Sequence, residues 1–196
     1  LSQEPVYEMF NAGRLDAFHE FSGKSRKIMP PASTGIDILG NKMVIVFLAT
    51  NDPVQYFSNP LQVNSYEYPE NYGKKSPFFS RAVKTKLDGK EVLLISGTAS
   101  IRESESVFIG DVTKQTVATI ENITELIKQS GLYNTPEKNH LSYSKLIYIK
   151  DPSNLNKVQN IMHNMHFLDP KDIFLQANVC RKELEIEICL SLSVSQ

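Results

Sequence analysis

The sequence has few cysteines, little net charge and no long apolar run, and each shortage excludes a class of protein. Its 196 residues include two cysteines, Cys180 and Cys189, which are too few for a disulfide framework. The formal net charge is −1, so neither nucleic acid nor an acidic membrane surface is an expected partner. No apolar run approaches the roughly 18–20 residues that span a bilayer, and no signal-peptide pattern opens the chain. A cytoplasmic location is therefore the default expectation.

Several short functional motifs are also missing. The sequence contains no P-loop, no GxGxxG, no Gx-Ser-xG elbow and no basic aromatic platform. His163 and His166 lie three residues apart on a predicted helix, but no second pair of ligands accompanies them, so no metal site is expected. The chain opens without Met on a helix-like segment, which suggests a processed or truncated form.

What remains is an ordinary globular composition, with 41% hydrophobic and 22% charged residues and enough length for one large or two small domains. In the first part, apolar spacing predicts a helix over residues 4–21. The nearly continuous apolar run over residues 42–49 predicts a buried strand. Residues 60–77, rich in Tyr, Pro and Gly, predict an irregular loop.

The second part of the sequence has a clearer pattern. A hairpin is predicted around Asp88-Gly89, and helices are predicted to begin at Asp111 and at Asp151-Pro152. The predicted strands and helices from about residue 80 cover residues 83–86, 91–96, 111–129, 145–150, 151–165, 173–179 and 184–194. Their order is β-β-α-β-α-β-β, so two helices can cover one face of a mixed sheet. The sequence therefore predicts an α+β fold.

Glu187 is the best candidate for chemistry. Strict alternation over residues 184–194 places it on the polar face of a strand whose other face belongs to the core. Burial of a carboxylate in the middle of a strand raises its pKa, which suits a general acid. The alternative is a solvated sheet face on which Glu183, Glu185 and Glu187 all contact water.

Three other side chains are weaker candidates when taken alone. Cys180 precedes Arg181, and a neighbouring guanidinium can lower the pKa of a thiol, although a lone cysteine is more often a small buried apolar residue. Arg14 and Arg81 could each bind a carboxylate through two hydrogen bonds, although most arginines are solvated. These alternatives remain open on the residues alone.

A series of segments makes the sequence resemble a known family. The segments are Pro31-Ala-Ser-Thr-Gly-Ile36, Asn59-Pro-Leu-Gln-Val63, Tyr68-Pro-Glu-Asn-Tyr-Gly73, Ser76-Pro-Phe-Phe-Ser-Arg-Ala82, Ile95-Ser-Gly-Thr-Ala-Ser-Ile101, Gly110-Asp111 with Gln115, and Val179-Cys-Arg181 through Glu187. In this order they resemble the chorismatases, enzymes that hydrolyse chorismate or form hydroxybenzoate from it. The resemblance covers nearly the whole chain.

The resemblance implies a pair of domains related to the YjgF/Rid imine deaminases. Residues 80–196 would be the C-terminal catalytic domain, and residues 1–79 the latter part of the first domain. Glu187 would be the acid that protonates the enolpyruvyl ether of chorismate, with release of pyruvate. Cys180 resembles the thiol of the subgroup that makes 3-hydroxybenzoate rather than a dihydrodiol.

The resemblance further implies how the substrate is held. Arg14 and Arg81 would bind the carboxylates of chorismate, with Tyr72, Thr98 and Ser100 lining the pocket. No metal or organic cofactor is implied, and a homotrimer is one expected assembly.

The sequence also departs from the family pattern. Glu103-Ser104 stands where a Gly-His pair usually follows, and the added negative charge should repel chorismate unless Arg102 compensates or the loop turns away. Cys189 replaces a glutamate, and the family's leading piece is absent. Two alternatives therefore stand beside the chorismatase interpretation. One is a non-catalytic or altered-substrate relative that acts as a partner protein. The other is a Rid-type deaminase, which the absence of arginine in residues 173–179 disfavours.

Overall fold

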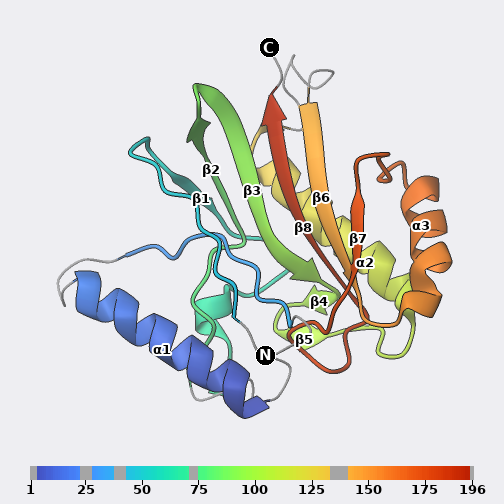
Figure 1. The fold of residues 1–196 in the computed structure, drawn as a ribbon, viewed down its shortest axis with the longest axis horizontal. Helices are drawn as coiled ribbons and strands as arrows, with labels where there is room; N and C mark the ends of the chain where they lie inside the picture. The colour runs from blue at the N-terminus through green and yellow to red at the C-terminus, as the bar shows by residue number, and fades with distance from the viewer. Residues whose placement is uncertain (1–3, 23–27, 38–42, 71–74, 133–140, 195–196) are drawn as a thin grey trace.

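The computed structural model describes residues 4–22, 28–37, 43–70, 75–132 and 141–194 (Figure 1). The elements are α1 (Glu4–Ser22), β1 (Gln55–Phe57), a 3-10 turn (Ser65–Glu67), β2 (Ala82–Leu87), β3 (Lys90–Ala99), β4 (Ile101–Arg102), β5 (Glu105–Ser106), α2 (Val112–Gln129), β6 (Leu141–Ile149), a 3-10 turn (Pro152–Asn154), α3 (Leu155–Asn164), β7 (Ile173–Gln176) and β8 (Ile186–Val194). The order predicted from residue 80 onward is confirmed, with the short β4–β5 ribbon as an addition.

One mixed sheet organises these elements. Its strand order is β1-β2-β3-β8-β6-β7, and every neighbouring pair is antiparallel except β6 and β7. Asp88 and Gly89 both adopt positive φ between β2 and β3, as the predicted tight hairpin turn requires. Asp111 caps α2, because its side chain accepts a hydrogen bond from the amide of Lys114.

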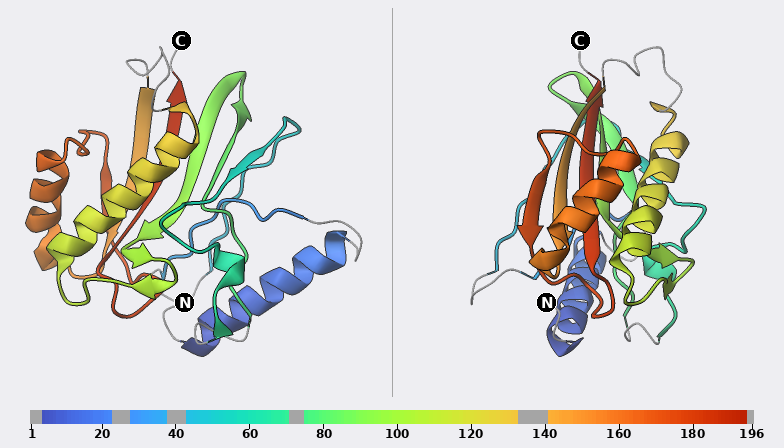
Figure 2. Two further views of the ribbon diagram at one scale, coloured as in Figure 1. Left: turned by 180° about the vertical axis from the view of Figure 1, so that it is seen from behind. Right: turned by 90° about the vertical axis from the view of Figure 1, so that its right-hand side faces the viewer.

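Both α2 and α3 pack on the same face of this sheet, and Figure 2 shows them together on one side of the strands. Alternation along β8 sends Ile186, Ile188, Leu190 and Leu192 toward these helices, where all four are buried. The β8 side chains of Glu187, Cys189, Ser191 and Ser193 point to the opposite side, which we call the helix-free face. The two-layer arrangement predicted from the sequence is confirmed.

One predicted strand is wrong for the residues that the structure describes. Residues 43–49 are extended but pair with no described strand, and the side chains of Met43 to Leu48 are 62–86% exposed. The sequence pattern of a buried strand is present, but no described residue covers it.

On α1, Met9 and Phe21 are exposed as well. No described helix has the length and apolar character needed to cross a membrane.

Candidate active site

Glu187 lies near the start of β8, on the helix-free face. It pairs with Ala99 of β3 on one side and with Tyr148 of β6 on the other, so it occupies a central strand. Only 4% of its surface is exposed. The alternative in which the Glu187 carboxylate lies on a solvated sheet face is therefore wrong.

Beside Glu187, a β-bulge interrupts the pairing of β3 with β8. Ile95 pairs with Leu190 and Thr98 pairs with Ile188, so Ser96 and Gly97 together oppose the single Cys189. A Cβ atom placed on Gly97 would stand 1.9 Å from the Oε1 atom of Glu187. The carboxylate thus packs directly on the backbone of Gly97, a contact that only glycine allows.

A remote segment, residues 30–37, crosses the sheet at this point. Ser33 donates its amide to the hydroxyl of Ser96 at 2.9 Å, and the Gly97 amide donates to the hydroxyl of Thr34 at the same distance. Farther along, Asp37 donates its amide to the carbonyl of Asn178. The segment is therefore held at both ends and passes over the bulge on which the carboxylate packs.

Burial gives Glu187 an unusual protonation state. A small apolar cluster occupies this end of the helix-free face: Ala99, Ile101, Val179 and Leu184, with Ile36, Tyr148 and Cys180 against it. Desolvation by these surroundings raises the pKa of Glu187 to about 7, even though the amide and thiol of Cys180 both donate hydrogen bonds that favour its charged form. A carboxyl group with this pKa can act as an acid near neutral pH.

The pKa of the Cys180 thiol is not lowered in the way that the neighbouring Arg181 suggested. Burial and the nearby Glu187 carboxylate raise the pKa of this thiol to about 12, and these effects outweigh the opposing influence of Arg181 and Arg81. The expected lowering of its pKa is therefore wrong. Cys180 stays a neutral hydrogen-bond donor to Glu187 rather than a thiolate nucleophile.

Helix α1 contributes a second group of polar side chains. Tyr7 hydrogen-bonds to Asn11, and burial followed by the proximity of Cys180 raises the pKa of Tyr7 well above its ordinary value. Arg14 donates to the hydroxyl of Ser33 at 3.1 Å, and its Nε is buried without a hydrogen-bond partner among the described residues. Glu187 and Arg14 both contribute to the electrostatic environment of Tyr7, so this helix brings a cation to the same side of the site.

Arg81 approaches from the start of β2. It is 4% exposed and donates to the hydroxyl of Tyr68 at 2.6 Å and to the carbonyl of Val63 at 2.8 Å. The guanidinium groups of Arg81 and Arg181 lie 5.5 and 5.2 Å from the centroid of the Tyr68 ring. The Nε of Arg81 is buried and has no partner in the described parts of the chain.

The structure does not bring all the predicted site residues together. Glu187 accepts hydrogen bonds from Cys180, whose pKa Arg81 influences, and Glu187 and Arg14 both influence the pKa of Tyr7. Thr98 pairs with Ile188, on the helix-covered side, and its hydroxyl donates to the carbonyl of Ser96.

Of the two remaining predicted residues, one is described by the structure and one is not. The fully buried Ser100 donates to the carbonyl of Val107 and so secures the β4–β5 ribbon. Tyr72 lies outside the described residues.

The departure at Glu103-Ser104 lies in the β4–β5 turn. Glu103 is exposed with a φ of 50°, and its backbone is held by Leu61 and Val63 on a neighbouring loop. Arg102 pairs instead with Glu121 and Asn122 of α2. The loop turns the negative charge of Glu103 toward solvent. This is one of the two conditions under which the charge was not expected to repel chorismate.

Several site residues were not predicted as such. Gly97 and Thr34 lie inside segments recognised in the sequence, yet neither has a local signal for its role. Tyr148 and Cys189 hydrogen-bond to each other beside Glu187, and burial raises the pKa of Tyr148 to about 12. Only the pairing of distant strands reveals these neighbours.

Among the described residues, no group of three or more His, Cys, Asp or Glu side chains is arranged to hold a metal ion.

Comparison with known proteins supports the resemblance seen in the sequence. A curated 3-hydroxybenzoate synthase from Streptomyces hygroscopicus is 30% identical over 194 residues, which cover 93% of this chain and 56% of that protein. A curated chorismatase from Streptomyces rapamycinicus is 29% identical, with the same coverage. The resemblance to chorismatases is confirmed. The chain spans about half the length of these chorismatase relatives. No protein-family model matches it.

Solved structures agree on the fold. A crystal structure of chorismatase matches with a TM-score of 0.74 at 24% identity, over 95% of this chain and 57% of that one. A crystal structure of a putative endoribonuclease L-PSP from Entamoeba histolytica matches with a TM-score of 0.52 at 11% identity, over 74% of this chain and 100% of that one. The predicted α+β fold class is confirmed. The predicted division at residues 79 and 80 stays a prediction.

Proposed function

We propose that this chain carries the acid-bearing part of a chorismatase-type enzyme, in which Glu187 protonates the enolpyruvyl ether of chorismate. One observation carries the proposal: a carboxyl group that is 4% exposed, with a pKa of about 7, packs on a glycine bulge between two strands. A group of this kind is half protonated near neutral pH and is held in one position. Both properties favour proton donation to a weakly basic carbon.

The two arginines support a doubly charged substrate. Arg14 and Arg81 each keep a buried Nε without a partner among the described residues, although each guanidinium also donates hydrogen bonds through a terminal nitrogen. A guanidinium donates best to a carboxylate, and an unpartnered buried donor is costly unless a ligand satisfies it. Two such donors around one acid fit the two carboxylates of chorismate better than they fit a neutral substrate.

The proposed reaction begins with transfer of the Glu187 proton to the methylene carbon of the enol ether. This forms a C–H bond and leaves an oxocarbenium carbon. In the hydrolytic branch, water adds to that carbon and the bond to the ring oxygen breaks. One proton of the water goes to the ring oxygen and the other returns to Glu187, so pyruvate and a dihydrodiol leave. In the 3-hydroxybenzoate branch the ring of the bound dihydrodiol then loses its second hydroxyl group and a ring proton as one molecule of water. The water consumed in the first stage is thereby released, and Glu187 ends as the protonated acid.

Cys180 is the proposed product-determining residue. Its thiol stays neutral and donates to Glu187, so its influence comes from its hydrogen bond and its volume rather than from nucleophilic attack. A curated relative that is 30% identical to this chain is named a 3-hydroxybenzoate synthase. That name favours 3-hydroxybenzoate as the product.

The partner-protein alternative rested on the Glu103-Ser104 departure and on the absent leading piece. Because the Glu103 side chain is exposed, its charge does not enter the surroundings of Glu187, and the first of these two grounds weakens. The deaminase alternative lacks its required arginine, since β7 (Ile173–Gln176) contains none.

The test is incubation of the purified protein with chorismate while pyruvate is followed by a coupled assay. Glu187→Gln should lower the rate on the order of 10³-fold, within the range for removing a general acid. Cys180→Ala should still release pyruvate but change the ratio of 3-hydroxybenzoate to dihydrodiol. A folded protein that binds chorismate without releasing pyruvate would favour the partner role, and ammonia released from an imine substrate would favour the deaminase.

A further inference from the structure

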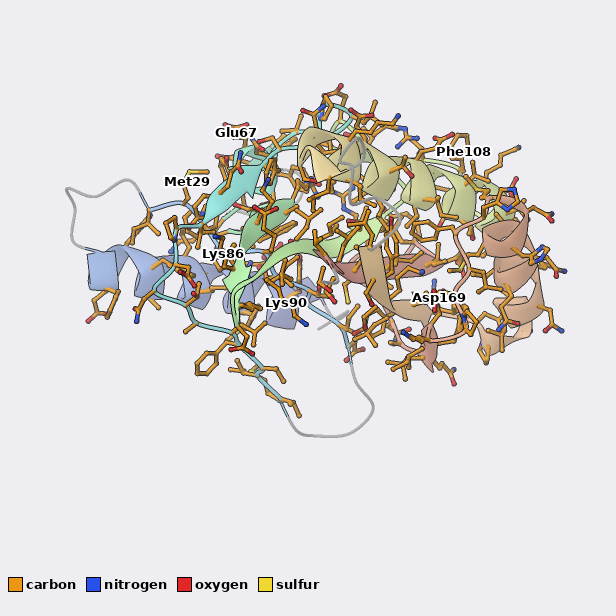
Figure 3. All side chains as sticks on the ribbon, turned by 90° about the horizontal axis from the view of Figure 1, so that it is seen from above. Met29, Glu67, Lys86, Lys90, Phe108 and Asp169 are labelled. Atoms are coloured by element: carbon orange, nitrogen blue, oxygen red, sulfur yellow. The ribbon has the colours of Figure 1, made fainter. Side chains whose placement is uncertain are left out.

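The most buried side chain that the structure describes on helix α1 is polar. It is Asn11, with 3% of its surface exposed. Figure 1 and Figure 3 show α1 apart from α3 and from α2, which begins shortly after the labelled Phe108. The centre of a helix's packed face is ordinarily apolar, and a buried amide is costly unless its polar atoms are hydrogen-bonded. The partners of Asn11 therefore indicate why an asparagine stands there.

These partners lie on the same helix. Tyr7 comes four residues before Asn11 and Arg14 three residues after it, so all three side chains share one face of α1. The Oδ1 atom of Asn11 accepts a hydrogen bond from Nη2 of Arg14 at 3.5 Å. The hydrogen bond between Asn11 and Tyr7 favours the ionised form of Tyr7, so Nδ2 of Asn11 is its donor. Both ends of the amide are thus engaged, and it is held in one orientation.

The guanidinium of Arg14 is held at two of its three nitrogen atoms. Nη1 donates to the hydroxyl of Ser33 at 3.1 Å, and Nη2 donates to Asn11. The third nitrogen, Nε, is buried and has no hydrogen-bond partner among the described residues. A guanidinium is rigid and planar, so two fixed nitrogens also fix the direction in which the third one donates. We call Asn11 and Ser33 the Arg14 clamp.

The Arg14 clamp is connected to the acid through Ser33. The amide of Ser33 donates to the hydroxyl of Ser96 at 2.9 Å, and the next residue, Gly97, is the one on which the Glu187 carboxyl group packs. Arg14 and Glu187 are therefore both held by the segment that crosses the bulge. Without the clamp, the long side chain of Arg14 would have several rotamers, and its distance from the acid would vary.

We propose that Asn11 is a positioning residue, which together with Ser33 directs the Nε–H group of Arg14 toward a carboxylate of the substrate. This inference rests on the proposed function, in which Arg14 binds that carboxylate. Asn11 acts through Arg14 and not on the reacting atoms. Its hydrogen bond to Tyr7 keeps the amide from turning, so that Oδ1 stays directed at Arg14.

The first test needs no substrate. NMR of the guanidinium nitrogens measures rotation about the Cζ–Nε bond of Arg14, which should be slow in the wild type and at least several-fold faster in Asn11→Leu. Asn11→Asp keeps an oxygen acceptor for Nη2 and should keep the rotation slow. Ala17→Leu is the matched control, because Ala17 is exposed on the same helix.

Ser33→Ala provides a second variant that removes only one hydroxyl group. It should also accelerate the rotation of the Arg14 guanidinium, and it guards against a loss of folding in Asn11→Leu. Rotation as slow as in the wild type in both variants would overturn the proposal.

The second test measures chorismate binding by calorimetry in Glu187→Gln, which cannot donate the proton. Addition of Asn11→Leu should raise the Kd on the order of 10-fold, about the effect of one hydrogen bond to a charged group. Ala17→Leu should leave the Kd unchanged. When Arg14→Gln is also present, Asn11→Leu should change the Kd less than about twofold, because Asn11 acts only through Arg14. An equal loss with and without Arg14 would make the role of Asn11 merely structural and overturn the proposal.

Failure of this inference and failure of the proposed function give different results. If Glu187 were not the acid, Glu187→Gln would still release pyruvate, while Asn11→Leu would still free the Arg14 guanidinium and weaken chorismate binding. If the clamp were wrong, Glu187→Gln would still stop pyruvate release, but Asn11→Leu would bind chorismate as the wild type does.

Discussion

The two faces of β8 differ in what they contribute, although one alternating sequence builds both. On the helix-covered face, Ile186, Ile188, Leu190 and Leu192 are buried by α2 and α3, which belong to the continuous core. On the helix-free face, Glu187 is buried by a bulge, a remote loop and the amide and thiol of Cys180. The first face stabilises the fold through apolar area. The second face keeps a carboxyl group out of contact with water, at some cost to that stability.

The largest expected effect on stability is on the helix-covered face. Ile188→Ala should lower the free energy of unfolding by about 4 kcal/mol, because it removes buried apolar volume and leaves a cavity. Ser191→Ala, on the other face of the same strand, should change it by less than about 0.5 kcal/mol. Urea denaturation of both variants measures the difference, and equal losses would erase the distinction between the faces.

Next comes the pH dependence that the helix-free face imposes. The pKa of Glu187 is raised from 4.5 to about 7 in the folded protein, so folding favours the protonated form. The stability that this provides is complete below pH 4.5 and is lost as the pH rises through about 7, a change of about 3 kcal/mol.

Glu187→Gln should remove this contribution. The unfolding free energy of the variant minus that of the wild type should therefore increase between pH 4.5 and 8. Guanidinium titrations across this range give the difference directly, and a constant difference would mean that Glu187 is solvated.

A steric change at the bulge should affect catalysis more than folding. Gly97→Ala places a Cβ atom 1.9 Å from the Oε1 atom of Glu187, so the carboxyl group must move away from Cys180. A displacement of this size should lower pyruvate release on the order of 100-fold. Gly35→Ala is the control, since its Cβ would meet nothing within 4 Å. Unchanged activity in Gly97→Ala would show that the position of the carboxyl group is unimportant.

The smallest effect is expected outside both faces. Glu103 holds a φ of 50°, a conformation that costs a residue with a side chain about 1 kcal/mol. Glu103→Gly should therefore raise the free energy of unfolding by up to about 1 kcal/mol and leave the pKa of Glu187 unchanged. Thermal denaturation and a carboxyl titration by NMR check the two halves of this expectation. A shifted pKa would place Glu103 close to the acid after all.

Local pattern was sufficient for much of this fold. Alternation in β8 identified the face of Glu187, and the residue types at Asp88-Gly89 and Asp111 identified a turn and a helix cap. These features depend on neighbours in the sequence, which periodicity reports directly. The same logic predicted a buried strand over residues 42–49, and it was wrong for residues 43–49 because no described residue covers them.

The surroundings of Glu187 could not be predicted in this way. Thr34 and Gly97 are 63 residues apart and meet only because the segment around Thr34 crosses the sheet. Tyr7 reaches the site from α1, and the guanidinium groups of two arginines lie within 5.5 Å of the centroid of the Tyr68 ring. Contacts of this kind follow from the paths of loops. Single-residue patterns do not encode those paths.

The bulge in β3 depends on a single extra residue. Ile95 and Thr98 keep their partners Leu190 and Ile188 whether one residue or two lie between them. Deletion of Gly97 would thus give an unbroken ladder in which Ser96 faces Cys189 and every other pair is retained. The acid-bearing sheet and a plain antiparallel ladder therefore differ by one residue, and the surface on which the Glu187 carboxyl group packs depends on that residue alone.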